Sequence, residues 1–149
     1  MKKNLLLFFL CCMGGFAGCK SQKIPTDFSL SFGVGGGFTG RWNGYAIDHL
    51  GNIHEWQGLG SQKQTAPIGV LSKKELQTLL KTFQKAKFEE INRDETANMT
   101  VQITLSQRGK IHSVRFPLSN EPTTSDQDPV TRLYALCMQA IRNVSAQIP

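Results

Sequence analysis

The sequence predicts an α+β domain, with an antiparallel sheet of about five strands and two helices packed on one face. Two pairs of segments alternate apolar and polar residues on either side of a short turn, as strands of a β-hairpin do. Two other segments repeat apolar residues every three or four positions, which is typical of amphipathic helices. Since hairpin strands pair antiparallel, we expect the helices to cover one face of the sheet and solvent to reach the other.

The first strand is expected to begin at Phe28, because Phe28, Leu30, Phe32 and Val34 alternate with small residues. The glycine-rich stretch 33–37 should end or bulge this strand. We expect an exposed loop over 38–44, a hairpin of 45–48 with 53–57 around a turn that contains Gly51, and a polar loop over 58–67.

The second half of the chain carries the clearest local signals. Ser72 and Glu75 form a capping box ahead of a helix that runs to about Ala86. A half-buried strand over 99–105 turns at Gly109 and returns over 111–116. After a polar loop at 118–127, Asp128 should cap a last helix, with Pro129 in its first turn and an apolar stripe to Val144.

The N-terminus has the features of a secretory signal. Lys2 and Lys3 precede a short apolar run, which is well below the ~20 residues of a spanning helix. The segment Phe16-Ala17-Gly18-Cys19 resembles the bacterial lipobox, in which cleavage falls just before a cysteine that carries a diacylglycerol and an acyl chain. We therefore expect three parts: a signal peptide at 1–18, lipidated Cys19 with a tether at 19–27, and a single domain at 28–149.

The expected lipid on Cys19 would hold the protein to a membrane of the bacterial cell envelope. Lys20 and Ser21 follow the cysteine, without the Asp that resembles an inner-membrane retention signal. The outer membrane is therefore favoured, and its periplasmic side is favoured over the cell surface. No cofactor besides the covalent lipid is expected.

Composition bounds the function further. The formal net charge of +6 includes Lys2 and Lys3, so the chain after cleavage carries +4. Its basic residues are dispersed, without the basic and aromatic array of a nucleic-acid-binding protein, and the lysines between 73 and 87 are expected to form a solvated helix face. Once the signal is removed and Cys19 is lipidated, Cys137 is the one free thiol, which excludes a disulfide within the chain. Its apolar helical setting predicts a buried, inert thiol.

Few residues of the sequence suggest a catalytic site. The chain has three histidines, and only His49 and His54 are close enough in sequence, on either side of a predicted turn, to face each other. The spacing of metal-binding motifs is missing, so no metal site is expected. The paired carboxylates at 89–90 and 94–95 read as solvated side chains. A small periplasmic enzyme, a hydrolase using His49 and His54 with nearby carboxylates, stays open as an alternative, although we expect no enzymatic activity.

The glycine-rich aromatic segment 35–45 is the best candidate for a binding site. Trp, Tyr and Arg are enriched at protein-binding hot spots, and a loop held between two strands presents its side chains rigidly. Packing of the aromatic rings on the sheet as a satellite core is the competing interpretation. The candidate partner-binding residues are Gly36, Gly37, Phe38, Thr39, Arg41, Trp42, Tyr45 and Trp56.

Several of these motifs together resemble the emfourin-like family of small proteinaceous inhibitors of thermolysin-like metalloproteases. The segments involved are Gly35-Gly36-Gly37-Phe38-Thr39-Gly40, the helix start Leu71-Ser72-Lys73-Lys74-Glu75-Leu76, Phe88, and the 99–116 hairpin with Gly109. The GGGFTG segment also resembles that of a group of small bacterial lipoproteins. The first resemblance implies that 35–40 and Arg41 contact a protein partner such as a protease.

Three functions are therefore carried forward. The leading one is a monomeric, lipid-anchored protein-binding module that uses the loop 35–45 and inhibits a protease. The second is the small enzyme described above. The third is a structural envelope lipoprotein without a discrete site.

Overall fold

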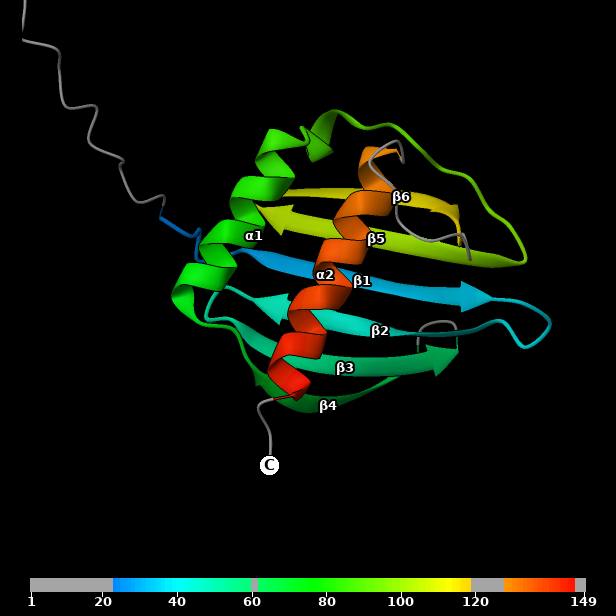
Figure 1. Ribbon diagram of the computed structural model, residues 1–149. Coiled ribbons are helices and arrows are strands. Elements are labelled where there is room, and N and C mark those ends of the chain that lie inside the picture. Colours follow the sequence, from blue (N-terminus) through cyan, green and yellow to red (C-terminus); the bar gives the residue numbers. More distant parts are fainter. Residues whose placement is uncertain (1–22, 60–61, 119–127, 147–149) are drawn as a thin grey trace, which may run out of the picture.

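The computed structural model describes residues 23–59, 62–118 and 128–146. Within these residues, six antiparallel strands form one sheet in the order β4-β3-β2-β1-β5-β6 (Figure 1). The predicted α+β class is confirmed, with six strands where about five were expected. The strands are β1 (Ser29–Gly36), β2 (Arg41–Asp48), β3 (Asn52–Leu59), β4 (Gln62–Val70), β5 (Met99–Gln107) and β6 (Lys110–Pro117).

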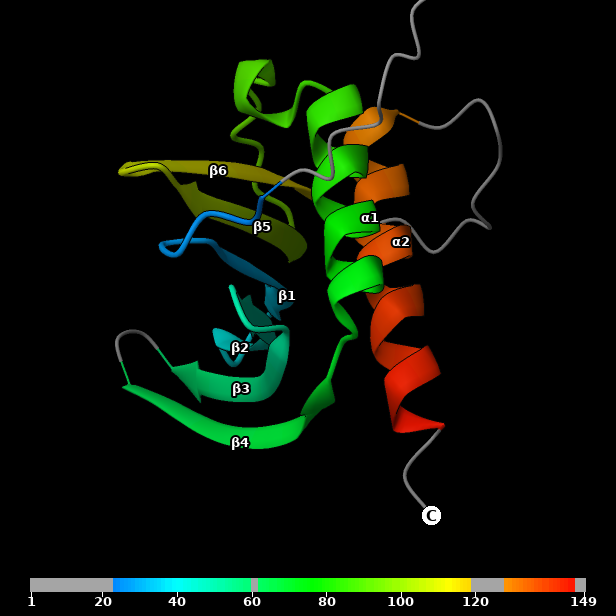
Figure 2. The ribbon, with the colours of Figure 1, turned by 90° about the vertical axis from the view of Figure 1, so that its left-hand side faces the viewer.

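Two α-helices in the described part of the chain, α1 (Lys73–Lys85) and α2 (Pro129–Ser145), lie on one side of the sheet (Figure 2). The 3-10 helix η1 (Phe88–Glu90) follows α1. Both predicted helix starts are confirmed: the Ser72 hydroxyl accepts from the amide of Glu75, whose carboxylate accepts from the amide of Ser72. Asp128 accepts from two amides of the first turn of α2, with Pro129 as its first residue.

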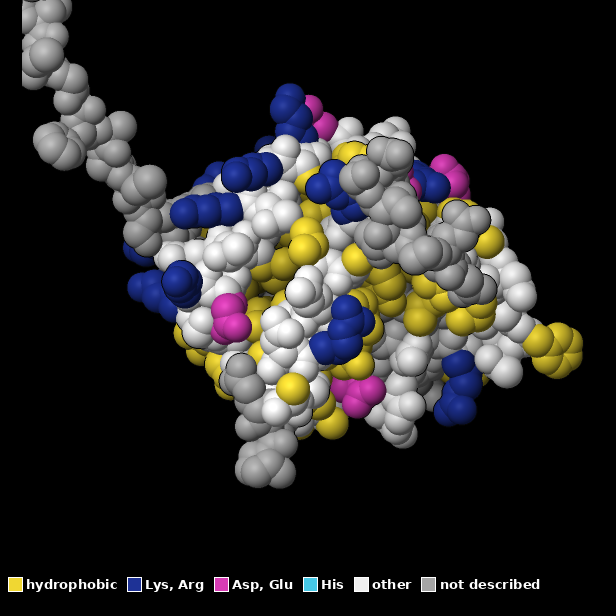
Figure 3. Space-filling view, in the orientation of Figure 1, with side chains coloured by type: hydrophobic (Ala, Val, Ile, Leu, Met, Phe, Trp, Pro, Cys, Tyr) yellow, Lys and Arg dark blue, Asp and Glu magenta, His cyan; other side chains and the backbone are white. Residues whose placement is uncertain are grey.

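The core lies between the helices and the sheet face that they cover. Alternate residues of the strands point into it, and they meet the apolar stripes of α1 and α2. Its largest fully buried side chains include Phe32, Phe83, Phe88, Leu30, Ile47, Ile53, Leu76, Leu80 and Ile103. The lysines between 73 and 87 are all exposed, as expected for a solvated helix face (Figure 3).

The exposed loop expected at 38–44 is a turn at 37–40, and the prediction was wrong for 41–44. β1 continues to Gly36 and β2 begins at Arg41, so only a short turn separates them. The pairing register is unbroken, with Gly33 opposite Gly44 and Gly35 opposite Trp42. Glycine is a poor strand residue because it has no side chain to pack, but here aromatic rings from neighbouring strands occupy the space above it.

The expected polar loop at 58–67 was also wrong, because β4 covers most of it. β4 is an edge strand whose residues are mostly exposed, and polar residues such as Lys63 suit a strand with one free edge. Pro67 lies beside a register shift between Ile53 and His54 of β3, where proline is tolerated in a sheet.

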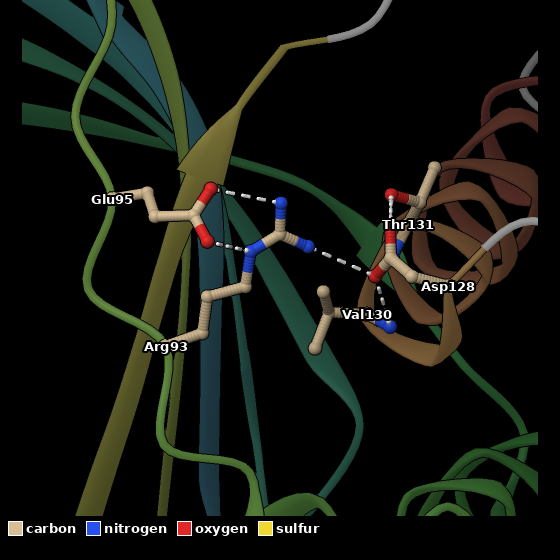
Figure 4. A network of polar contacts seen from close by, with 5 residues as sticks. All are labelled: Arg93, Glu95, Asp128, Val130 and Thr131. Carbon is tan, nitrogen blue, oxygen red and sulfur yellow. Dashed lines mark hydrogen bonds and ion pairs between the residues drawn. The ribbon is translucent and has the colours of Figure 1, made fainter.

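The segment between η1 and β5 runs along β6 at the opposite edge of the sheet. Arg93 pairs with Glu95, with Nε to Oε1 at 2.9 Å, and its Nη1 lies 3.2 Å from Oδ1 of Asp128 (Figure 4). The guanidinium also lies 5.4 Å from the ring centroid of Phe116. Arg93 therefore connects this edge of the sheet to the cap of α2.

The end of the expected tether is joined to the domain. The amide of Gly109, in the β5–β6 turn, donates to Asp27 Oδ2 at 2.6 Å. Backbone hydrogen bonds from Arg108 and Gly109 lower the pKa of Asp27.

The predicted signal peptide, Cys19 and residues 119–127 of the loop expected at 118–127 lie outside the described residues. Among the residues described, none of the helices is long and apolar enough to cross a membrane.

Candidate binding site

The predicted partner-binding residues are divided among three locations. Gly36, Gly37, Phe38, Thr39 and Arg41 form the turn between β1 and β2 and its flanks, which we call the hairpin tip. Trp42 and Trp56 lie on the sheet face that the helices leave uncovered, called the open face below. Tyr45 is on the helix-covered face, so the three groups can't form one contiguous site.

The hairpin tip has a defined backbone. Gly37 and Gly40 have φ of 63° and 61°, in the left-handed region that glycine adopts without strain. The amide of Gly40 donates to the carbonyl of Gly37 at 3.3 Å, and the amide of Gly37 donates to the carbonyl of Asn98. The amide of Arg41 donates to Thr39 Oγ1 at 3.4 Å. These bonds fix the turn between two paired strands.

Phe38 is fully exposed at this tip, with a relative accessibility of 106%. Leu59 and Met99, which flank the tip, are partly exposed, at 57% and 39%. A Cβ at Gly40 would lie 3.6 Å from Leu59 Cδ1, and one at Gly37 would lie 3.5 Å from Met99 Sδ. Three exposed hydrophobic side chains therefore belong to the hairpin tip and its flanks, and Figure 3 shows one hydrophobic side chain projecting at this end of the molecule.

The hairpin tip and residues 23–27, the described end of the expected tether, are at opposite ends of the domain (Figure 1). β1 begins at Ser29, just after the tether, and ends at Gly36, just before the turn. Its eight residues span about 24 Å at the usual rise per strand residue. A molecule held by its N-terminus would therefore present Phe38 on the side away from the attachment.

On the open face, both tryptophan rings lie over glycines of neighbouring strands. A Cβ at Gly35 would lie 2.1 Å from Cδ2 of Trp42. A Cβ at Gly33 or at Gly44 would lie 2.8 Å from Cζ2 of Trp56. The glycines are therefore the floor on which the rings rest, which explains a glycine-rich stretch inside regular strands.

A pocket of about 300 Å³ opens beside these rings. Trp56 is only 8% exposed, and Nζ of Lys63 lies 4.3 Å from its ring centroid. Its Nε1 is buried and has no hydrogen-bond partner among the described residues. The residues lining the pocket are Ser31, Trp42, Trp56, Gly58, Lys63, Gln102 and Thr104.

Sequence reasoning identified only the two tryptophans of this pocket. The alternation of 99–105 already predicts that Gln102 and Thr104 share the polar face of their strand, and that signal could have found them. Lys63 could not be found in this way, because its segment was expected to be a loop.

Tyr45 packs against the core instead of facing solvent. Its ring centroid lies 5.8 Å from that of Phe32, and it is partly buried beside the main cluster. The competing interpretation was that Trp42 and Tyr45 pack on the sheet, and both rings do so: Trp42 lies on Gly35 at the open face, and Tyr45 lies on Phe32 beside the main core.

The residues of the enzyme alternative have structural partners. Burial opposes ionisation of Asp48, but hydrogen bonds from Asn52 and Leu50 outweigh it and lower the pKa of this carboxyl. His49 lies in the turn that Asp48 stabilises, whereas His54 is on the open face of β3. Among the described residues, no group of three or more His, Cys, Asp or Glu side chains could hold a metal ion.

The paired carboxylates predicted from the sequence are also engaged. Each accepts a hydrogen bond or ion pair from a nearby side chain. The donors are Gln107 to Glu89, Lys87 to Glu90, Arg115 to Asp94 and Arg93 to Glu95. The hydrogen bond from Arg115 lowers the pKa of Asp94, which favours its ionised form.

Comparison with known proteins gives no family assignment. No protein-family model matches the chain, and no curated protein is significantly similar to it.

Proposed function

We propose that this protein is a monomeric, lipid-anchored protein of the bacterial cell envelope that binds another protein through its hairpin tip. Cys19 carries the lipid, and the protein lies on the periplasmic side of the outer membrane. It acts by binding and not by catalysis, with no cofactor besides the lipid and no nucleic-acid partner.

The exposure of Phe38 supports this proposal most directly. An aromatic side chain without any packing in the free domain contributes little to the fold, whereas aromatic side chains are enriched at the centre of protein interfaces. The turn beneath it is fixed by backbone hydrogen bonds, so little conformational freedom is lost on binding.

The position of the tip also suits a tethered binder. Phe38, Leu59 and Met99 belong to the turn and strand ends on the side of the sheet opposite residues 23–27. In the proposed tethered protein, this is the end that a partner in the periplasm reaches. Arg41 beside them adds a cation of the type common in hot spots. The resemblance to emfourin-like inhibitors makes a protease the first partner class to test.

A crosslinking pull-down from envelope extract tests the proposal, with the full chain as bait and Phe38→Ala as the variant. Ile111→Ala is the matched control, since Ile111 is 75% exposed and lies beside the β5–β6 turn, near the tether. We expect one partner captured by the wild type and by Ile111→Ala but lost with Phe38→Ala. Equal capture by all three proteins would reject the hairpin tip as the binding surface.

A protease partner is tested by its activity. The purified partner should lose activity on addition of the wild-type protein and keep it on addition of Phe38→Ala. If the captured partner is not a protease, the proposed binding function stands and the proposed protease inhibition is rejected.

A further inference from the structure

We propose that the pocket on the open face of the sheet is a second binding site, which takes a sugar ring carrying an acidic group. The site differs from the hairpin tip in its position and in its chemistry. It is a concave pocket with aromatic and hydrogen-bonding walls, whereas the tip is a convex apolar projection.

The aromatic part of the pocket is held in place by the sheet. Trp42 packs on Gly35, and Trp56 packs on Gly33 and Gly44, so the backbone of the sheet stops either ring from moving closer to it. The Trp56 ring is almost fully buried, while that of Trp42 is half-buried and offers the accessible surface. Flat aromatic faces carry partial negative charge, and the C–H groups on one face of a pyranose carry partial positive charge. A sugar ring therefore stacks favourably on such a surface.

The polar part of the pocket lies along β1 and β5. Ser31, Gln102 and Thr104 line it, and all three are half-buried. Gln102 Nε2 donates to Thr104 Oγ1 at 3.2 Å, and Thr104 Oγ1 lies 2.8 Å from Ser113 Oγ. These bonds orient the side chains but leave acceptor and donor capacity on the amide of Gln102 and the hydroxyl of Ser31. Several neutral hydrogen-bonding groups beside an aromatic surface suit a ligand with several hydroxyls.

Lys63 gives the pocket its charge. Among the described residues that line the pocket it is the single ionisable side chain, and its ammonium group lies over the Trp56 ring. Among the described residues, no carboxylate forms an ion pair with it. An ammonium group that no described carboxylate pairs favours an anionic ligand, because opposite charges attract. A carboxylate on the sugar ring meets this requirement.

The volume of the pocket is consistent with such a ligand. About 300 Å³ is at the lower end of small-molecule pockets, which suits one or two sugar rings better than a long peptide. Nε1 of Trp56 is buried and has no hydrogen-bond acceptor among the described residues. Because this atom is buried, the hydrogen bonds to a ligand come from the polar side chains of the pocket and not from the indole.

The tryptophans allow a direct test, because the chain has two and both line the pocket. The full chain, purified in a detergent without a sugar head group, is titrated with galacturonate, with galactose and with polygalacturonate while indole emission is followed. Galacturonate represents a free acidic sugar, polygalacturonate the same chemistry within a glycan, and galactose lacks the acid. We expect saturable changes with one or both acidic probes and at least tenfold weaker binding of galactose.

Lys63→Met and Lys81→Met form the matched pair of variants, because both lysines are exposed and Lys81 lies on α1. Lys63→Met should weaken binding of the acidic probe about tenfold, as expected for a charged hydrogen bond, while Lys81→Met should leave it unchanged. Equal weakening by both would indicate attraction to net charge alone and would overturn the proposal. So would an emission unchanged by all three probes, which would show that the pocket does not take an acidic sugar.

The two proposals fail independently. Phe38→Ala should leave galacturonate binding unchanged, because Phe38 doesn't line the pocket. Lys63→Met should leave capture of the protein partner unchanged.

Discussion

The ring of Trp42 rests on Gly35 of the neighbouring strand, and a Cβ at residue 35 would lie only 2.1 Å from Cδ2 of the ring. Cβ atoms do not approach other atoms so closely, so a side chain at position 35 and the present position of Trp42 exclude each other. Trp42 can form the wall of the pocket only because residue 35 is a glycine, and Gly35 lies within β1 and does not end it.

Gly35→Ala should therefore displace Trp42. We expect the free energy of unfolding to fall by about 1–3 kcal/mol, as for other overpacked sites, and the tryptophan emission to shift toward that of exposed indole. Denaturant titration and emission spectra of the folded protein measure the two effects. Gly109→Ala is the control: a Cβ there meets nothing within 4 Å, so only the cost of its φ of 71° remains. An unchanged emission for Gly35→Ala would contradict this account of the pocket wall.

Tyr45 is expected to act on stability and not on partner binding. Because its ring packs on Phe32 and is partly buried, Tyr45→Ala should lower the free energy of unfolding by about 2 kcal/mol, less than for a fully buried ring. Tyr45→Phe keeps the ring and should stay close to the wild type. Phe38→Ala, by contrast, should change stability by no more than about 0.5 kcal/mol. If Tyr45→Ala kept the wild-type free energy of unfolding but no longer captured the partner, Tyr45 would belong to the binding surface after all.

Most of the secondary structure could be predicted because its signals are local. The capping box of Ser72 and Glu75, the Asp128-Pro129 helix start and the alternation of 99–116 each act within a few residues. The choice of helix-covered face followed from the same alternation. None of these predictions required knowledge of which strands are neighbours.

The features of the sheet that could not be predicted depend on contacts between neighbouring strands. Gly33 and Gly35 are regular strand residues only because tryptophans from β2 and β3 lie over them. β4 forms because the mostly exposed segment 62–70 completes the hydrogen bonds of β3, a contribution that side-chain periodicity does not reveal. The separation of Tyr45 from Trp42 has the same origin, since an odd spacing in a strand puts two residues on opposite faces, which matters only once the loop is known to be a strand.

Cys137 should be unreactive in the folded protein. It is fully buried in α2, and this burial raises the pKa of its thiol, so the reactive thiolate is disfavoured. Iodoacetamide at about pH 8.5, near the pKa of a free cysteine, should leave the peptide that contains Cys137 unmodified until denaturant is added. Mass spectrometry of that peptide measures the modification. Rapid labelling under native conditions would show that α2 opens from the sheet.

Substitution of Cys137 separates its packing from its chemistry. Cys137→Ala should cost about 1 kcal/mol for the lost contacts, and Cys137→Ser about 1–3 kcal/mol, because a hydroxyl is buried among apolar side chains. Denaturant titration of both variants gives this order. A serine variant as stable as the alanine variant would mean that the site admits water.

Asp128 should make the free energy of unfolding depend on pH in the acid range. Burial opposes its ionisation, but hydrogen bonds from Thr131 and Val130 and the charge of Arg93 outweigh burial and lower its pKa in the folded state. The unfolded chain has the ordinary aspartate pKa of about 3.9, so it binds the proton more readily than the folded protein does. The contribution is therefore complete above about pH 5 and is lost as the pH falls through the lower, folded-state pKa.

Asp128→Asn isolates this effect, because asparagine also caps helices but does not titrate. The free energy of unfolding of the wild type should fall more steeply than that of Asp128→Asn between about pH 5 and pH 2, and the two curves should converge at the acid end. Both proteins keep the other carboxyls whose pKa values are lowered, at Asp27, Asp48, Glu75 and Asp94, so the difference between the curves belongs to residue 128. Parallel curves would show that the cap and the Arg93 contact do not distinguish the ionised from the protonated carboxyl.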